Sequence, residues 1–256
     1  MTHSPWRGQV ALVSGAGSES GIGIAIARRL GQAGVRVILT ASSARIQQRV
    51  AELQSEGIDA CGQPADLTDE SQVIALAEWA LARHGRIDFL VNCLGTQQIE
   101  PLVDVTEDAF DRVMDVNLKA AMFLAQAVAR VQIATRSGGR HVHLLSVRAA
   151  LGMRDRGYSS YCSSKGGLAM LVRQHAVELA REGINVNGVA PTVVKTRMAS
   201  DWSDPELHRR LLERIPLGRV AEVEDVSGPV LFFLGPASAF VTGQILYVDG
   251  GITATQ

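Results

Sequence analysis

Short apolar runs rich in β-branched residues alternate along the chain with longer segments of helical periodicity. The apolar runs predict strands at Val10–Ser14, Val35–Thr40, Ile58–Gln63, Ile87–Asn92, His141–Ser146, Asn185–Ala190 and Gln244–Val248. The periodic segments predict helices near Ile22–Ala33, Ala44–Glu56, Asp69–His84, Thr106–Ala134, Ser159–Arg181 and Val223–Gly235. Because strands alternate with helices and are apolar on both sides, we expect an α/β fold. The seven strands would form one parallel sheet in a single doubly wound domain, with helices on both faces.

Glycines mark the ends of the predicted helices. Gly34, Gly57, Gly85 and Gly183 each stand between a helical segment and the next predicted strand, as C-terminal cap glycines do. The sequence shows no internal repeat, low-complexity tract or linker. The pattern therefore predicts one domain over residues 1–256.

One stretch of the chain has no clear period. Residues 191–205 follow a predicted strand and lack a continuous apolar face. In α/β proteins, substrate loops follow the carboxyl ends of the strands. We therefore expect a substrate lid over about residues 192–215, with Met198 and Trp202 on its substrate side.

Composition and charge narrow the class of protein. The chain has 256 residues, 46% of them apolar, and a net charge of −1 at pH 7. Since nothing supplies a broad basic field, we expect neither a nucleic acid nor an anionic membrane as partner. The N-terminal residues show no signal pattern, and no apolar run approaches a membrane span. The cysteines Cys61, Cys93 and Cys162 form no C-x-x-C pair, which indicates a reducing compartment and a cytoplasmic protein.

A glycine-rich turn follows the first predicted strand and opens the first predicted helix. It contains Gly15, Gly21 and Gly23. Glycines at this place let the backbone approach a pyrophosphate, whose charge is favoured by the N-terminus of the helix. The turn therefore predicts a dinucleotide site, with a tight turn that binds nothing as the alternative. Its spacing departs from plain G-x-G-x-x-G, because five residues separate Gly15 from Gly21.

Tyr161 and Lys165 stand four positions apart in a predicted helix and so share one face. An ammonium beside a phenol favours the phenolate and lowers the phenol pKa from its usual value of about 10. Such a phenol can pass a proton to or from a hydroxyl group. For the pair alone, an ordinary exposed helix face is the alternative.

His141 and His143 alternate along a predicted strand, without an acidic or cysteine partner at ligand spacing. They are expected to face the helices that cover the sheet. The sequence therefore predicts no metal site.

Taken in order, these and further motifs resemble the short-chain dehydrogenase/reductase family. The motifs are the glycine loop ending in G-I-G, N-C-L-G (Asn92–Gly95), V-N-L (Val116–Leu118), Ser146 after a fifth strand, Y-x-x-x-K, V-N-G-V-A-P-T (Val186–Thr192), P-L-G-R (Pro216–Arg219) and V-T-G-Q-I-L-Y-V-D-G-G (Val241–Gly251). The resemblance covers essentially the whole chain and implies a Rossmann fold. Three features depart from the family pattern: a glycine loop two residues longer that begins at Ser14, Cys93 and Leu94 within N-C-L-G, and Thr192 where the family has glycine.

The resemblance implies four catalytic residues, which are Asn117, Ser146, Tyr161 and Lys165. Tyr161 would exchange a proton with the substrate oxygen. Lys165 would lower the pKa of that phenol and hold the nicotinamide ribose. Ser146 would hydrogen-bond the substrate oxygen, and Asn117 would anchor a water leading to Lys165.

Spacing from the tyrosine and the strand pattern indicate different positions for the catalytic serine. Relatives often place this serine closer to the tyrosine, where this chain has Arg148. The strand pattern Gly139–Val147 instead ends on Ser146, so we expect two extra residues in the loop Met153–Gly157.

The resemblance also implies contacts to a nicotinamide cofactor. They are Gly15, Gly21, Ile22, Gly23, Ser42, Arg45, Asp66, Leu67, Asn92, Gly95, Tyr161, Lys165, Pro191, Val194 and Thr196. A simple helix-entry role is the alternative for Asp66.

The end of the second predicted strand bears on the choice between NAD and NADP. A site for NAD needs an acid there to accept the ribose hydroxyls, and this chain has Ala41. Ser42, Ser43 and Arg45 follow and suit a 2′-phosphate. Glu19 in the glycine loop argues the other way, so the sequence favours NADP(H) over NAD(H) without excluding the latter.

The expected reaction is hydride transfer between a nicotinamide cofactor and a small secondary alcohol or ketone. The tail of the chain is similar to the branch of 3-oxoacyl-carrier-protein reductases and glucose dehydrogenases, so 3-oxoacyl reduction is the alternative. Glu182 stands where a basic residue would help a carrier protein to dock. A non-catalytic dinucleotide sensor is a more distant alternative, which the complete catalytic set disfavours.

Two further expectations concern the substrate and the assembly. Arg148, Arg154 and Arg156 either form a positive edge for an anionic or sugar-like substrate, or belong to a solvated loop. The segment Thr106–Ala134 and the small residues after Tyr161 resemble the helices through which the family dimerises. We therefore expect a homotetramer or a homodimer.

Overall fold

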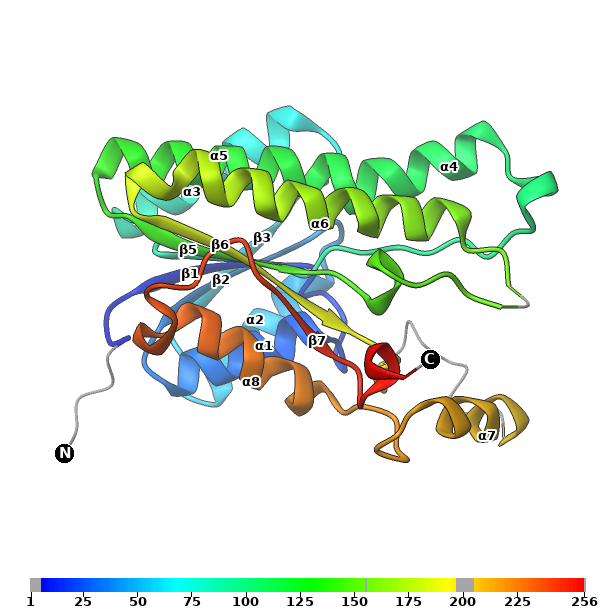
Figure 1. Cartoon of the computed structure of the whole chain (residues 1–256). Helices are drawn as coiled ribbons and strands as arrows, with labels where there is room; N and C mark the ends of the chain where they lie inside the picture. Colours follow the sequence, from blue (N-terminus) through cyan, green and yellow to red (C-terminus); the bar gives the residue numbers. More distant parts are fainter. Residues whose placement is uncertain (1–5, 155, 197–204, 256) are drawn as a thin grey trace.

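Seven parallel strands form one sheet in the order β3-β2-β1-β4-β5-β6-β7 (Figure 1). The structure is a computed structural model, and it describes residues 6–154, 156–196 and 205–255. The strands are β1 (Val10–Ser14), β2 (Arg36–Ala41), β3 (Ala60–Pro64), β4 (Phe89–Asn92), β5 (Gly139–Leu144), β6 (Ile184–Pro191) and β7 (Ile245–Val248). Every neighbouring pair is parallel. The α/β fold with a seven-stranded parallel sheet, predicted from the sequence, is confirmed.

Two layers of helices cover the sheet. The longer helices are α1 (Ile22–Gln32), α2 (Arg45–Ser55), α3 (Glu70–His84), α4 (Glu107–Met114), α5 (Ala120–Thr135), α6 (Ser159–Leu179), α7 (Pro205–Arg214) and α8 (Val223–Leu234). Short helical turns lie at Leu102–Asp104, Asp115–Lys119, Val147–Ala149, Ala180–Glu182, Pro236–Ser238 and Ile252–Ala254. Figure 1 shows α3, α5 and α6 on one face of the sheet and α1, α2 and α8 on the other. In the described part of the chain, no helix has the length and apolarity needed to cross a membrane.

The strand β1 shows how the sequence builds a core on both faces. All five of its residues are buried. Ala11 and Val13 pack in the cluster that includes α1 and α8, whereas Val10 and Leu12 pack in the cluster that includes α3 and α5. Because successive side chains of a strand point to opposite faces, a continuous apolar run supplies both layers.

The predicted helix over Thr106–Ala134 is not one regular helix. It consists of α4, a π-helical turn at Asp115–Lys119 and α5. The predicted start holds, because the Thr106 hydroxyl accepts a hydrogen bond from the Ala109 amide at 3.3 Å. The π turn inserts one extra residue into the helix. The spacing of apolar residues along the sequence does not indicate it.

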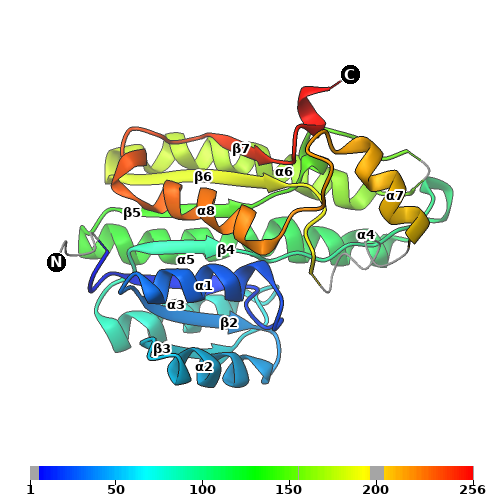
Figure 2. The same cartoon turned by 90° about the horizontal axis from the view of Figure 1, so that it is seen from below.

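The helix α7 was not expected from the sequence. It lies within the expected lid region, beyond the strand ends to which the arrowheads point in Figure 2. Met198 and Trp202 lie outside the described residues. The glycines expected at helix ends are confirmed, since Gly34, Gly57, Gly85 and Gly183 all have positive φ angles.

Candidate active site

A cavity of about 760 Å³ opens at the carboxyl edge of the sheet. This edge includes the switch point between β1 and β4, where the strand order reverses and where open α/β sheets bind ligands. All the predicted site residues line the cavity except Asn92 and Asn117. Most of the predicted residues therefore lie around one cavity, which extends from the glycine loop to Ser146, Tyr161 and Lys165.

The glycine loop fits tightly against the end of β4. Gly15 has a φ angle of +67°, and a Cβ atom built there would lie 2.5 Å from the Cys93 carbonyl oxygen. A Cβ atom at Gly23 would lie 2.8 Å from the Gly15 carbonyl oxygen. Only glycine allows this turn, which brings the start of α1 to the cavity.

The N-terminus of α1 is suited to an anion. Its N-cap residue is Gly21, and no side chain caps the helix. The first amides of the helix therefore keep their N–H groups available, and the helix dipole favours negative charge there. These features fit a pyrophosphate, so the residues present suit a dinucleotide.

The end of β2 carries the groups expected to contact the adenosine half of a cofactor. Ala41, Ser42, Ser43 and Arg45 line the cavity there, and the Arg45 Nε atom donates a hydrogen bond to the Ser43 hydroxyl at 3.2 Å. No carboxylate stands at the end of the strand. One guanidinium and two hydroxyl groups on this segment, without a carboxylate, are groups that suit a phosphate.

Glu19 lies opposite a buried arginine. The Arg49 Nη1 atom is 3.9 Å from the Glu19 carboxylate, and Arg49 also pairs with Glu52. The Arg49 side chain is 9% exposed. Because Arg49 pairs more closely with Glu52 and the Glu19 side chain is 86% exposed, the contact between Glu19 and Arg49 is weak.

Asp66 lines the cavity and also starts a turn. Its carboxylate accepts hydrogen bonds from the Thr68 amide at 3.0 Å and the Thr68 hydroxyl at 2.7 Å. The helix-entry role that the sequence left open is therefore present. Asp69 is the N-cap of α3, because its carboxylate accepts a hydrogen bond from the Ser71 amide at 2.9 Å.

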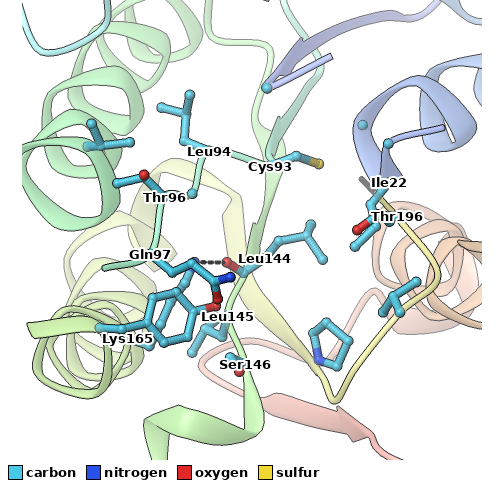
Figure 3. A pocket seen from close by; sticks show the side chains of 18 of the residues that line it. Ile22, Cys93, Leu94, Thr96, Gln97, Leu144, Leu145, Ser146, Lys165 and Thr196 are labelled. Carbon is cyan, nitrogen blue, oxygen red and sulfur yellow. Dashed lines mark hydrogen bonds between the residues drawn. The ribbon is translucent and has the colours of Figure 1, made fainter. Parts of the chain in front are cut away.

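The other end of the cavity holds the proposed catalytic groups. Lys165 on α6 is 2% exposed, and its ammonium donates to the Leu144 carbonyl at 2.8 Å (Figure 3). The same nitrogen is 5.8 Å from the centre of the Tyr161 ring. Ser146 follows β5, and its hydroxyl accepts a hydrogen bond from the Arg148 amide at 3.1 Å. In Figure 3, Ile22 and Thr196 lie across the pocket from Lys165 and Ser146.

Burial shifts the two titratable groups of this end in opposite directions. Burial raises the pKa of Tyr161 to about 12, although a hydrogen bond with Ser146 and the nearby charge of Arg148 oppose the rise. Burial lowers the pKa of Lys165 to about 8. The Lys165 ammonium is directed at the Leu144 carbonyl here, so burial dominates the pKa of Tyr161, and the effect of Lys165 on the phenol stays a prediction.

Asn117 lies in the π turn behind the cavity wall. Its amide accepts from the Thr96 amide at 2.8 Å and donates to the Thr96 carbonyl and the Ser164 hydroxyl, both at 2.9 Å. The side chain thus fixes the segment after β4 against α6. The π turn places the amide in this position, as such turns often do near functional sites.

Asn92 has a similar supporting position. Its side-chain oxygen accepts from the Ser14 hydroxyl at 2.8 Å and the Leu94 amide at 3.2 Å, and its nitrogen lies 3.3 Å from His143. It therefore ties the ends of β1, β4 and β5 together beneath the cavity.

His141 and His143 are fully buried and bonded within the fold. The His141 ring pairs with Gln132 at 2.9 Å, and the His143 ring pairs with Asn92. In the part of the chain that the structure describes, no group of three His, Cys, Asp or Glu side chains is placed to hold a metal ion.

Several residues of the outer cavity were not found from the sequence. They are Gln97, Met153, Tyr158, Leu211, Arg214 and Ile252. Leu211 and Arg214 belong to α7, whose charged residues at positions three and four apart are a helix signal that went unused. For the others, which lie in loops and turns or just before α6, no periodic pattern exists.

Comparison with known proteins agrees with this geometry. A family model described as enoyl-(acyl carrier protein) reductase matches residues 15–253. The chain is 39% identical over 254 residues to L-xylulose reductase from Bos taurus, covering 97% of this chain and 98% of that protein. It is 39% identical over 253 residues to D-erythrulose reductase from Gallus gallus, covering 96% of both. A solved gluconate 5-dehydrogenase from Burkholderia cenocepacia in complex with NADP and tartrate matches 100% of both chains with a TM-score of 0.93 and 33% identity.

Proposed function

Because the chain belongs to the short-chain dehydrogenase/reductase family, it is an NAD(P)(H)-dependent oxidoreductase acting on CH–OH groups, and we propose that its substrate is a small polyhydroxylated ketone. The observation that carries the proposal is the convergence of Ser146, Tyr161 and Lys165 on the cavity that begins at the glycine loop. A carbonyl group held there would lie between a proton donor and the place of a nicotinamide.

The chemistry of the reduction divides between the cofactor and the chain. The nicotinamide, when bound, supplies the hydride. Tyr161 gives its phenolic proton to the carbonyl oxygen as the C=O π bond breaks, and Ser146 holds that oxygen. Lys165 stabilises the phenolate that remains.

In this scheme Asn117 holds neighbouring residues in place. Its amide fixes Thr96 and Ser164, which flank the cavity wall on two different elements. The family resemblance implies that Asn117 anchors a water leading to Lys165. In this structure, however, the Asn117 side chain forms its hydrogen bonds with protein groups. We therefore assign Asn117 as a positioning residue.

The cofactor proposed is NADP(H) in preference to NAD(H). Ser42, Ser43 and Arg45 supply hydroxyls and a guanidinium at the end of β2, without a competing carboxylate. Glu19 is the one feature against this choice, and it does not line the cavity. The relative solved with NADP supports the same choice.

A polyhydroxylated ketone is supported by the relatives and by the cavity. The relatives named above are reductases of L-xylulose and D-erythrulose. The outer cavity offers polar groups for hydroxyls, among them Gln97 and Tyr158, which hydrogen-bond to each other at 3.4 Å.

The same proposal extends to α7 and to the assembly. Leu211 and Arg214 bring α7 to the cavity, which supports a lid that includes this helix.

Exposed apolar residues lie on α6, at Met170 and Val177, and near the end of the chain, at Phe240 and Leu246. These faces support a homotetramer or homodimer. The cysteines of the chain are free, which supports a reducing compartment such as the cytoplasm.

An assay of cofactor oxidation tests the proposed function. L-xylulose, D-erythrulose and a keto form of gluconate are each offered with NADPH and with NADH. We expect reduction of at least one of them, with NADPH preferred. Reduction of 3-oxoacyl thioesters alone would instead favour the alternative activity.

A further inference from the structure

We propose that the ketone substrate carries an anionic group, a carboxylate or a phosphate, which Arg148 and Arg214 bind at the outer end of the cavity. The inference rests on the proposed function, since it names the class of ketone that the same site reduces. Only Arg148 of the three arginines considered from the sequence lines this cavity. Arg214 joins it from α7, a helix that the sequence analysis did not predict.

The two arginines approach the cavity from separate elements. Arg148 lies two residues after Ser146, in the short helical turn Val147–Ala149. Arg214 is the last residue of α7, and its Nη1 atom lies 3.9 Å from the Met153 sulfur, beside the loop before α6. Met153 and Tyr158 line the cavity with them. The guanidinium groups therefore share one end of the space that holds Tyr161.

Neither of these guanidinium groups has a carboxylate partner among the described residues. Arg148 donates from Nη1 to the carbonyls of Leu151, at 3.3 Å, and Gly152. On the same helix as Arg214, by contrast, Arg209 pairs with Glu206 and Glu213, and Arg210 pairs with Glu206. Among the described residues, glutamates thus pair with the α7 arginines outside the cavity lining, and the arginine that lines the cavity has no carboxylate partner.

The shared position has an electrostatic consequence. Burial lowers the pKa of Arg148, and the positive charge of Arg214 lowers it further. Two like charges at the same end of the cavity repel each other, and an anion between them relieves the repulsion for both. Guanidinium groups bind carboxylate and phosphate oxygens through paired N–H donors, which suits either anion.

The location of this site limits the size of the substrate. Arg148 is close enough to Tyr158 and Tyr161 to interact with both phenols electrostatically. A substrate with its carbonyl at Tyr161 would therefore place its anionic group only a few atoms away. During reduction the hydride goes to the carbonyl carbon and the Tyr161 proton to the oxygen, and the anionic group is unchanged. The class that fits is a short keto acid or ketose phosphate with hydroxyl groups.

The test compares ketones of equal chain length that differ only in the terminal group. A neutral ketose, the corresponding keto sugar acid and the ketose phosphate are reduced by the unmodified protein, Arg214→Gln and Arg210→Gln. Arg210→Gln is the matched control, since it removes the same charge from the same helix at a residue outside the cavity lining. We expect kcat/KM to be at least about tenfold higher for an anionic ketone than for the neutral one. Arg214→Gln should lower the ratio of kcat/KM for the anionic ketone to that for the neutral one at least about tenfold, and Arg210→Gln should leave this ratio unchanged.

A second variant separates binding from the structural role of Arg148. Arg148→Lys keeps the charge and loses the paired donors, so kcat/KM should fall more for the anionic ketone than for the neutral one. Competitive inhibition by tartrate, a small dicarboxylate, should weaken in Arg214→Gln and not in Arg210→Gln. Whichever of the acid and the phosphate is preferred identifies the anion.

Two results would overturn the inference. The first is a neutral ketose reduced as efficiently as both anionic ketones, which leaves the proposed function intact. The second is equal behaviour of Arg214→Gln and Arg210→Gln. Failure to reduce any ketone, with NADPH still bound, would instead overturn the proposed function and the inference with it.

Discussion

Tyr161 and Lys165 lie near each other, and burial moves their pKa values in opposite directions. The phenol, with a pKa raised to about 12, stays protonated at neutral pH and is ready to donate. Lys165, with a pKa lowered to about 8, is an ammonium only below that pH. We therefore expect kcat for ketone reduction to be level up to about pH 7 and to fall as the pH rises through about 8, because the charge that stabilises the phenolate is lost.

The reverse reaction should show the opposite trend. Alcohol oxidation requires Tyr161 to give up its proton first, so its rate should rise with pH. Profiles of kcat in both directions check this. A reduction rate that increases between about pH 7 and about pH 9 would exclude Lys165 as the stabilising charge.

Ala41 is the residue at which cofactor choice can be changed most directly. An aspartate there would accept the ribose hydroxyls of NAD and repel a 2′-phosphate. We expect Ala41→Asp to raise the Kd for NADPH by at least about tenfold and to lower the Kd for NADH, measured by fluorescence titration. Ala44→Asp is the control, since Ala44 is exposed and lies outside the cavity lining. Equal changes in the two variants would mean that only net charge matters.

Among the elements, the glycine loop depends most on a single backbone conformation. In Gly15→Ala, the new methyl group would meet the Cys93 carbonyl and strain a φ angle of +67°. Gly57→Ala is a matched variant, since Gly57 has a φ angle of +79° and nothing within 4 Å of the added atom. Gly57→Ala should cost about 1–2 kcal/mol of unfolding free energy from left-handed strain alone.

Gly15→Ala should cost more than this and should also weaken cofactor binding by at least about tenfold, because the loop must move. Chemical denaturation and NADPH titration of both variants provide the comparison. Unchanged NADPH binding in Gly15→Ala would show that the loop does not contact the cofactor.

The same elements show what a sequence can and cannot predict here. The strands followed from continuous apolar runs, because a sheet covered on both faces buries every side chain of β1. The glycine loop and the Tyr161–Lys165 pair could be predicted because the chemistry of each requires particular residue types at a fixed spacing. The π turn at Asn117 changes the helix by one residue and leaves no periodic trace. Arg214 was missed because contact between α7 and the cavity depends on tertiary structure.

For the whole molecule, buried histidines predict how stability depends on pH. His141, His143 and His175 are buried, and burial lowers the pKa of each below its usual value near 6.5, to about 3 for His141. Below about pH 6.5 the unfolded chain binds protons that the folded chain does not. The free energy of unfolding should therefore fall as the pH drops from about 6.5, by about 1.4 kcal/mol per pH unit for each histidine that stays neutral.

Urea denaturation at a series of pH values measures this slope. The variant His175→Leu should lower the slope of unfolding free energy against pH by the contribution of one histidine, at most about 1.4 kcal/mol per pH unit. It removes a ring whose nearest polar contact is the Met122 sulfur at 3.2 Å, so the fold should tolerate the change. A slope that is the same in the variant and the unmodified protein would exclude His175 from the effect.

The central claim is that this chain transfers a hydride from a nicotinamide to a ketone with Tyr161 as the proton donor. The most direct test offers NADPH that carries deuterium at the transferable position, together with a polyhydroxylated ketone, and follows the label by mass spectrometry. The unmodified protein and the control Tyr247→Phe, altered at a tyrosine outside the cavity lining, should give an alcohol that carries the deuterium on carbon. Tyr161→Phe should bind NADPH with a similar Kd and form at least about a hundredfold less labelled alcohol. Unlabelled alcohol, or labelled alcohol formed equally fast by Tyr161→Phe, would contradict the account.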